Sequence, residues 1–436
     1  MNLEKLLKYM IGLSIVWNGW MIFKGPPSVF FYYAIVVLVL PLLFFHYKTF
    51  FKKLFYAHFI IITIGVLQIA MGNNTVFLFL KVYTGLLIVS TFSYYAIKLM
   101  KYDAVQLFRY SLFWIYIIAI IGVVQFFSYL VRFRPGFDFN WFTHHHVVVS
   151  GPLIRITSIM GEPSVIAQVF APAFFLALCR ILRLRPFIIK SIPAAVLIIF
   201  IYLFSQSSTA YIGIFATLVI LIINFSKPKN LIAAGLTLFL LFNLLYTTSD
   251  AFRMRMDSAG MVFASYNLNI SLENNSAMKR NHSIDGSTFV LFNNLFVAFN
   301  NFKRQPITGT GLGSHQIAYK RYSLTRRFKE FANISELNYS DANSLAIRLL
   351  SEFGLVGVIF SLFIIFGCFV RRNPLNANEP YWLISGAILT FLIVTYIRKG
   401  HYFHYGLTMY FMFYYFNWKN HKDFKNRIQR KTPLAT

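Results

Sequence analysis

Residues 107–131 read LFRYSLFWIYIIAIIGVVQFFSYLV, an apolar run in which Arg109 is the only charged residue. An α-helix needs about 20 consecutive apolar residues to cross the hydrocarbon core of a bilayer. This run is therefore long enough to span a membrane, and eleven similar runs occur along the chain. They lie near residues 6–23, 28–46, 54–71, 75–97, 163–181, 187–204, 208–225, 230–248, 342–370, 379–397 and 400–418.

The composition indicates an integral membrane protein. Of the 436 residues, 57% are hydrophobic and only 13% are charged, whereas a soluble domain carries roughly 25% charged residues. So few charges do not cover the surface of a soluble protein of this size. We predict an all-α fold: a polytopic transmembrane helical bundle of about twelve spans, with one large periplasmic loop that contains short helices.

The charge distribution predicts the orientation. The chain has 41 basic and 14 acidic residues, for a net charge of +27, which in a soluble protein suggests nucleic-acid binding. Here the basic residues lie in short loops between apolar runs, which favours a topology signal and anionic lipid headgroups instead. With a cytoplasmic N-terminus, 22 Lys and Arg fall in inner segments and six in short outer loops. We therefore expect a multi-pass membrane protein with both termini in the cytoplasm.

These spans divide the chain into four parts. Residues 1–248 hold nine spans and a smaller outer loop at 132–162. Residues 249–341 form the large periplasmic loop, 342–418 the last three spans, and 419–436 a basic cytoplasmic tail. Cys179 and Cys368 are the only cysteines and form no C-x-x-C pattern. We therefore expect neither a disulfide nor a metal site.

Four motifs map to the predicted outer face. The first, RITSIMGEPS at 155–164, combines Arg155 with Glu162 just before a span. At a membrane boundary an Arg binds anions and a carboxylate accepts protons. Alternatively, Arg155 anchors to headgroups, and Glu162 caps a helix whose dipole stabilises it. The second motif, SQSST at 205–209, is either a polar hairpin turn or the lining of a cavity.

The third motif is PITGTGLGSH at 306–315, which includes Gly311 and His315. A glycine-rich loop of this kind can hold phosphate through backbone N–H groups. It does not follow a strand of a βαβ unit, so a dinucleotide site is excluded, and a plain turn is the alternative.

The fourth motif is DANSLAIRLLSEFGLVG at 341–357. Helical periodicity places Asp341, Arg348 and Glu352 on one face. Charged residues inside a span usually face the bundle interior or a wet cavity. Arg348 and Glu352 alternatively neutralise each other at i,i+4. Arg398, Lys399 and His401, in the last outer turn, either join an anion site or anchor the helices.

In this order, the motifs resemble the O-antigen polymerase and O-antigen ligase superfamily of membrane glycosyltransferases, over roughly residues 150–370. The resemblance implies a metal-independent enzyme without cofactors that uses a polyprenyl-pyrophosphate-linked sugar donor on the periplasmic side. There are two departures from the pattern. Asn343 stands where many members carry a His, and Ser208 stands where many carry an Arg. Because ligases rely on that His, its absence favours a polymerase.

We therefore expect a polymerase that joins undecaprenyl-pyrophosphate-linked repeat units by inverting glycosyl transfer. The candidate catalytic residues are Glu162, Asp341 and Asn343, with Glu162 or Asp341 as the base. The pyrophosphate would be bound by residues chosen for positive charge or loop geometry: Arg155, Arg348, Arg398, Gly311 and His315.

The expected partners are the lipid-linked oligosaccharide and the bilayer. A chain-length regulator is a candidate partner, and nucleic acid is not expected. One alternative is an O-antigen ligase that transfers polymer to lipid A-core. Another is a transporter or flippase of lipid-linked oligosaccharide, which twelve spans fit equally well. Transporters tend to have paired repeats and broken helices, and neither is evident in the sequence.

Overall fold

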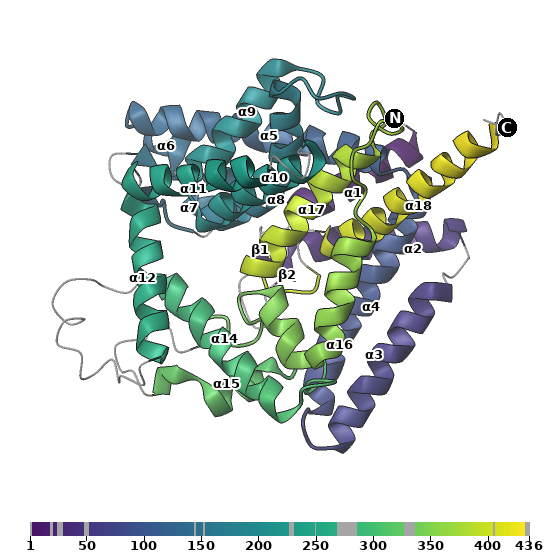
Figure 1. Ribbon diagram of the computed structural model, residues 1–436, viewed down its shortest axis with the longest axis vertical. Coiled ribbons are helices and arrows are strands. Elements are labelled where there is room, and N and C mark those ends of the chain that lie inside the picture. Colours follow the sequence, from purple (N-terminus) through teal and green to yellow (C-terminus); the bar gives the residue numbers. More distant parts are fainter. Residues whose placement is uncertain are drawn as a thin grey trace.

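The computed structural model of the protein describes residues 2–17, 21–23, 29–47, 52–143, 145–150, 153–225, 231–248, 250–267, 286–326, 336–403 and 406–431. These residues fold into an all-α bundle (Figure 1). Each predicted span coincides with a helix. These helices are α1 (Leu3–Val16), α2 (Phe31–Tyr47), α3 (Lys52–Ala70), α4 (Val76–Leu99), α5 (Ala104–Leu130), α8 (Pro163–Ile181), α9 (Ile192–Phe204), α10 (Ser208–Phe225), α11 (Leu231–Thr248), α16 (Leu345–Gly367), α17 (Tyr381–Arg398) and α18 (Leu407–Lys431).

The remaining elements lie between these helices in the sequence. The helical ones are α6 (Arg134–Phe137), α7 (Asn140–Thr143), η1 (Ser158–Met160), α12 (Asp250–Asn267), α14 (Gly286–Arg304), α15 (His315–Tyr322) and η4 (Leu324–Arg326). The strands β1 (Met21–Phe23) and β2 (Val29–Phe30) pair antiparallel, as do β3 (Val149–Ser150) and β4 (Leu153–Ile154).

Six of the described helices, α4, α5, α8, α10, α16 and α17, are long and apolar enough to cross a membrane, and three shorter helices are also apolar. This confirms a polytopic helical bundle, while the number of twelve spans stays a prediction. The predicted spans and the helices differ most in three places. α1 ends at Val16 instead of near residue 23, and α9 begins only at Ile192, where the Ser191 hydroxyl caps it. α18 runs from Leu407 to Lys431 instead of 400–418.

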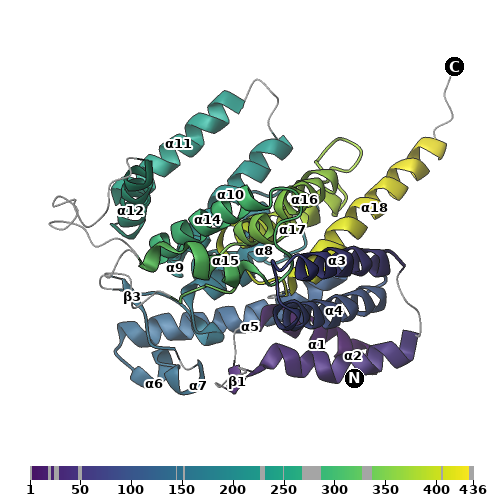
Figure 2. The same ribbon diagram turned by 90° about the horizontal axis from the view of Figure 1, so that it is seen from below.

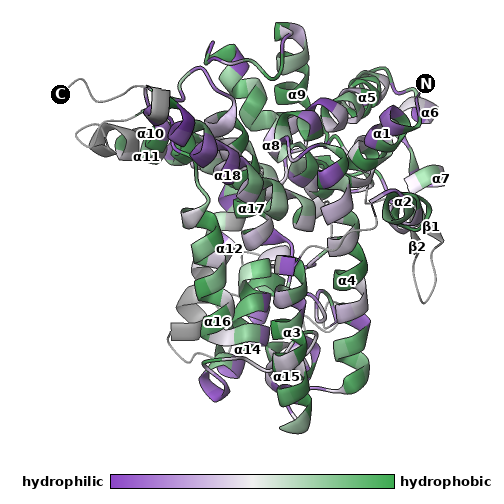
Figure 3. Ribbon diagram, turned by 90° about the vertical axis from the view of Figure 1, so that its right-hand side faces the viewer, coloured by the Kyte–Doolittle hydropathy of each residue, from purple (hydrophilic) through white to green (hydrophobic). Residues whose placement is uncertain are grey.

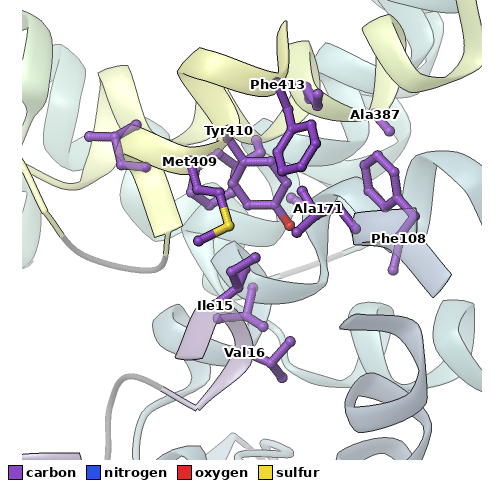
Figure 4. Packing of buried hydrophobic residues seen from close by; sticks show 14 of the residues in the cluster. Ile15, Val16, Phe108, Ala171, Ala387, Met409, Tyr410 and Phe413 are labelled. Atoms are coloured by element: carbon purple, nitrogen blue, oxygen red, sulfur yellow. The ribbon is translucent and has the colours of Figure 1, made fainter. Parts of the chain in front are cut away.

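The centre of the bundle is formed by α8 and α17, which are buried along most of their length. They lie against each other and against α10. Small residues allow this close approach; a Cβ on Gly386 of α17 would overlap the ring of Phe175 of α8. Figure 4 shows Ala171 and Ala387 of these two helices beside the aromatic rings of Tyr410 and Phe413 of α18.

Apolar side chains also cover the outside of the bundle. Val37 of α2, Phe77 of α4 and Phe363 of α16 are exposed, and Figure 3 shows apolar residues along α3, α4 and α16. In water such a surface would be a strong aggregation site. It suits helices whose outer faces contact lipid.

The helix ends that carry the motifs gather at one end of the bundle. The Ile156 N–H donates to the Phe204 carbonyl at 3.0 Å, and the Ser344 hydroxyl donates to the Tyr396 carbonyl at 2.6 Å. These residues adjoin the start of α8, the end of α9, the start of α16 and the end of α17. We call this end, which the sequence predicts to be periplasmic, the motif end.

Helices α12, α14 and α15 come from residues predicted to form the large outer loop. α14 packs against α12, α15 and α16, as Figures 1 and 2 also show. Its buried face includes Phe289 and Val297, together with Asn293, Asn294 and Asn301. α14 therefore brings amide side chains to the start of α16, where the fourth motif lies.

Candidate active site

A short link, residues 398–402, starts at the last residue of α17 and joins the motif segments to one another. Arg398 donates to the Ser287 hydroxyl at the start of α14. Lys399 Nζ donates to Ser164 Oγ of the first motif at 3.1 Å. Through these two contacts the link connects the core helix α17 to α8 and to α14.

The other side of the link contacts the fourth motif. His401 Nε2 lies 2.8 Å from Asp341 Oδ2, and the Tyr402 hydroxyl donates to Glu352 Oε2 at 2.7 Å. The carbonyl of Gly400, the residue before His401, accepts a hydrogen bond from Arg348 Nη1 at 2.9 Å. The link thus contacts Asp341, Arg348 and Glu352. The expectation that all three share a helical face is wrong for Asp341, which lies in the turn before α16.

Asp341 is buried and held by several donors. The Asn338 side chain and the Asn343 N–H both donate to Oδ1, at 3.0 and 3.1 Å, and His401 binds Oδ2. Burial raises the pKa of Asp341, but the hydrogen bond and charge of His401, the Asn343 N–H and the charge of Arg348 outweigh it. The pKa of this carboxyl is therefore below its ordinary value, and Asp341 is an anion.

The backbone around Asp341 is unusual. Ala342 and Asn343 both have positive φ, at 62° and 55°, a region that is costly for alanine. Asparagine tolerates this region better, which gives Asn343 a conformational role beside its predicted catalytic one. Ser344 then caps α16, since its Oγ accepts from the Ile347 N–H at 3.3 Å. Strain of this kind persists where the surrounding structure enforces it.

Arg348 and Glu352 form a buried ion pair inside α16. Arg348 Nε lies 2.9 Å from Glu352 Oε1, and their side chains are 4% and 0% exposed. The guanidinium also lies over the Tyr402 ring, 4.3 Å from its centroid. The geometry therefore favours mutual neutralisation, one of the two alternatives left open by the sequence. Binding of pyrophosphate by Arg348 stays a prediction.

The helix α16 is broken at Gly354, whose φ and ψ are 56° and −141°. No broken helix was expected from the sequence, and this expectation is wrong at Gly354. The break frees main-chain groups of α16, and the third motif pairs with them. The Leu355 and Val356 N–H groups donate to the carbonyls of Pro306 and Ile307, at 2.8 and 3.1 Å. Irregular backbone at this depth is tolerated only where protein groups satisfy it.

The glycines of the third motif serve this pairing. The N–H groups of Thr310 and Gly311 donate to the Ser351 and Glu352 carbonyls, at 3.3 and 2.8 Å. A Cβ on Gly309 would overlap the Glu352 backbone. Because these N–H groups are bound to α16, the geometry favours a packed turn over a phosphate cradle.

His315 lies inside the protein, at the start of α15. Its ring Nε2 is 2.9 Å from Asn294 Oδ1 of α14. The main-chain N–H of His315 donates to Glu352 Oε1 at 3.4 Å. Burial, and then the charge of Arg348, lower the pKa of His315 from 6.5 to about 3. His315 is therefore neutral and joins α14, α15 and α16. Its predicted contact with pyrophosphate has no support in this position.

The first motif adds a second carboxylate. Glu162 is exposed at the cap of α8, and the Ser164 hydroxyl donates to its Oε2 at 3.0 Å. The same hydroxyl accepts from Lys399. The pKa of Lys399 is below its ordinary value, mainly because the residue is buried. The charge of Arg398 adds to this lowering, whereas the charges of Glu162 and Asp341 oppose it. Four charged residues from three segments therefore share one neighbourhood.

Arg155 connects the first motif to the second. It is half-buried, and its Nε donates to the Ser205 carbonyl at 3.5 Å. In the loop between α7 and α8, His145 packs against Gly161, where a Cβ would be 2.6 Å from the ring. His146 is exposed. The motif end thus includes Arg155 beside the polar turn at the end of α9.

A cavity of about 350 Å³ opens between α10, α11, α12, α14 and α17. Its polar lining residues are Arg398, Ser208, Ser287 and Thr288, of which Arg398 and Ser287 are hydrogen-bonded to each other. The rest is largely apolar: Tyr211, Ile212, Phe215, Phe242, Phe252, Met256, Ala259, Leu291 and Ile397. Ser208 belongs to the second motif, so this polar turn reaches a cavity as well as forming a hairpin.

Residues 193–362 match the O-antigen ligase family. This match covers 170 of the 436 residues and confirms the resemblance to the O-antigen ligase/polymerase superfamily predicted from the motifs. No curated protein matches the chain significantly. The O-antigen ligase segment runs from α9 into α16 and contains the second, third and fourth motifs.

Several site residues lie outside the O-antigen ligase segment. Arg155 and Glu162 precede it, and the link at 398–402 follows it. From sequence, Lys399 and His401 were recognised only as an anion site or a membrane anchor. The available signal was two basic residues and a histidine beside Gly400, at the end of a span. Within the described residues, no three His, Cys, Asp or Glu side chains are placed to hold a metal ion.

Proposed function

We propose that this protein is a surface-polysaccharide polymerase that joins undecaprenyl-pyrophosphate-linked repeat units on the periplasmic face by inverting glycosyl transfer. The O-antigen ligase match supports this class of reaction in polysaccharide biosynthesis. The observation that carries the proposal is the position of Arg398. Arg398 lines a largely apolar cavity. It is adjacent in sequence to Lys399, whose side chain contacts Ser164 of the first motif.

A polyprenyl-pyrophosphate has an apolar chain and an anionic head. The aromatic and aliphatic walls of the cavity suit the chain, and burial of each CH₂ contributes about 0.8 kcal/mol. Arg398, Ser208 and Ser287 provide donors for the phosphates, and charge-assisted hydrogen bonds of this kind are strong. The cavity thus presents matched surfaces to both halves of the donor.

The reaction needs stabilisation of the leaving pyrophosphate as its charge develops. Preorganised cations in a water-poor site supply this. Arg398 and Lys399 are next to each other in the link, and Arg155 lies beside the second motif, which also lines the cavity through Ser208. We assign Arg398 and Arg155 to the pyrophosphate, with Lys399 as an additional positive charge.

Asn343 favours a polymerase over a ligase, because it stands where the ligases that this chain resembles rely on a histidine. The ligase alternative remains because the matching family is described as O-antigen ligase. A deletion strain separates the two. Loss of a polymerase leaves single repeat units attached to lipid A-core, whereas loss of a ligase leaves nothing attached.

A transporter would also be expected to have a broken helix, and α16 has one. Its freed main-chain groups, however, are paired with residues 306–311 of the same chain, so they are not available to a transported ligand. This pairing favours the enzyme.

The direct test is polymer formation by the purified protein in lipid nanodiscs supplied with lipid-linked repeat units. The wild type should give a ladder of chain lengths. Arg398→Ala should raise KM for the donor and lower kcat, and Arg155→Ala should abolish the ladder while the protein still inserts. Arg427→Ala is the matched control, because Arg427 is exposed near the C-terminal end of α18. A wild-type protein that forms no polymer would refute the proposal.

A further inference from the structure

Asp341 and His401 come from different parts of the chain and meet at the motif end. Asp341 lies in the turn before α16, and His401 lies in the link between α17 and α18. The carboxylate Oδ2 and the imidazole Nε2 are 2.8 Å apart. The other carboxylate oxygen is held by Asn338 and by the Asn343 N–H. The carboxylate is therefore fixed in place, and it fixes the imidazole.

The two partners differ in exposure. The side chain of Asp341 is 8% exposed and that of His401 is 35% exposed. Three donors surround Asp341 in its enclosed position, so its oxygens are poorly placed to receive a further proton. The imidazole reaches solvent. Since Asp341 is an anion, Nε2 carries the proton of the shared hydrogen bond, and Nδ1 carries the lone pair.

We propose that His401 is the general base that takes the proton from the acceptor hydroxyl, and that Asp341 positions its imidazole. The inference rests on the proposed glycosyl transfer. The acceptor oxygen forms a bond to the anomeric carbon of the donor as its proton moves to His401. The bond between that carbon and the pyrophosphate oxygen breaks, and its electron pair leaves with the carrier pyrophosphate. The imidazolium then returns the proton to water.

The position of His401 suits this reaction. It follows Arg398 and Lys399, which the proposed function assigns to the leaving group, by three and two residues. An acceptor hydroxyl held over the link would thus have the base and the leaving-group cations on one short segment. Positioned acids and bases of this kind contribute about 10²–10⁴-fold to a rate.

The charges around His401 come from several elements. Asp341 contacts the ring from the turn before α16, and Arg348 of α16 binds the neighbouring Gly400 carbonyl. Lys399 is two residues away and is tied to Glu162 of α8 through Ser164. Among these, the Asp341 carboxylate is the group in direct contact with the imidazole. It is therefore the group that orients the ring.

The test uses full-length protein in nanodiscs with lipid-linked repeat units. His401→Ala should lower kcat by about 10²–10⁴-fold with little change in KM for the donor. Added imidazole should restore part of the lost activity. His401→Gln keeps an N–H for Asp341 and should fold like the wild type, yet it should be equally inactive. His146→Ala is the control, because His146 is an exposed histidine of the smaller outer loop.

Asp341→Asn tests the positioning role. It weakens the contact that orients the imidazole, so kcat should fall with little change in KM for the donor. A purely structural role would lower the amount of folded protein and leave kcat per folded molecule unchanged.

Two failures are distinguishable. If the wild type forms no polymer, the proposed function is wrong. If the wild type forms polymer and both His401 variants retain its kcat, only the assignment of the base is wrong. Loss of activity in His401→Ala without rescue by imidazole, with a fully active His401→Gln, would also overturn it.

Discussion

The backbone of Gly400 lies directly against the carbonyl of Asp341, so that a Cβ at position 400 would overlap this oxygen. The contact is between main chains of two segments that are far apart in the sequence. It brings the link after α17 against the turn before α16, and His401 reaches Asp341 as a result. A side chain at position 400 has no space unless these two segments separate.

Gly400→Ala should therefore reduce both stability and polymer formation. The thermal unfolding midpoint in detergent and the polymer ladder measure the two effects. Gly367→Ala is the matched control, since the nearest atoms to a Cβ there are 3.7 Å away, an ordinary packing distance. A Gly400→Ala protein with a wild-type midpoint would show that the contact is looser than described.

The break in α16 depends on glycine. Gly354 has a φ of 56°, and a Cβ on it would be 2.5 Å from the Pro306 carbonyl oxygen. We expect Gly354→Ala to lower the free energy of unfolding by at least the roughly 1–3 kcal/mol of such backbone strain. Gly367→Ala, on the same helix, should have little effect. If both variants unfold at the same temperature, the break does not require glycine.

Removal of one member of the Arg348–Glu352 pair should be more costly than removal of both. Glu352→Gln leaves a buried guanidinium without its counter-charge, at a cost of about 3–5 kcal/mol. The double variant Arg348→Met with Glu352→Leu should recover a large part of this loss, because it buries no charge. Denaturation midpoints of the single and double variants give the comparison. A double variant less stable than either single one would argue against neutralisation.

His315 should make the fold sensitive to acid. Burial keeps its pKa at about 3 in the folded protein, whereas the unfolded chain takes up a proton at its ordinary value near 6.5. The unfolded state then binds more protons, so the free energy of unfolding should fall as pH decreases from about 6.5 towards 3. His315→Gln should weaken this dependence, measured as unfolding midpoints at pH 7 and pH 5. His146→Gln should retain the wild-type dependence.

The helices were largely predictable, whereas the contacts of the site were not. Apolar runs such as 107–131 require helices, because lipid leaves main-chain groups no partner outside the chain. The glycines at 309–313 indicated a special backbone, but local pattern does not show that α16 is its partner. Likewise, the meeting of His401 with Asp341 depends on which helix ends are neighbours. A single sequence contains that information only through the folded structure.

The exchange of hydrogen bonds between residues 306–311 and the broken part of α16 has a mechanical consequence. The Pro306 and Ile307 carbonyls accept hydrogen bonds from N–H groups of α16 beside its break. The loop segment and α16 therefore form one hydrogen-bonded unit. A force applied to the loop would therefore act directly on the part of α16 that follows Gly354. The loop and this part of α16 should leave the bilayer in a single extraction step. This segment of the loop is therefore a structural part of the helical bundle and not a separate appendage.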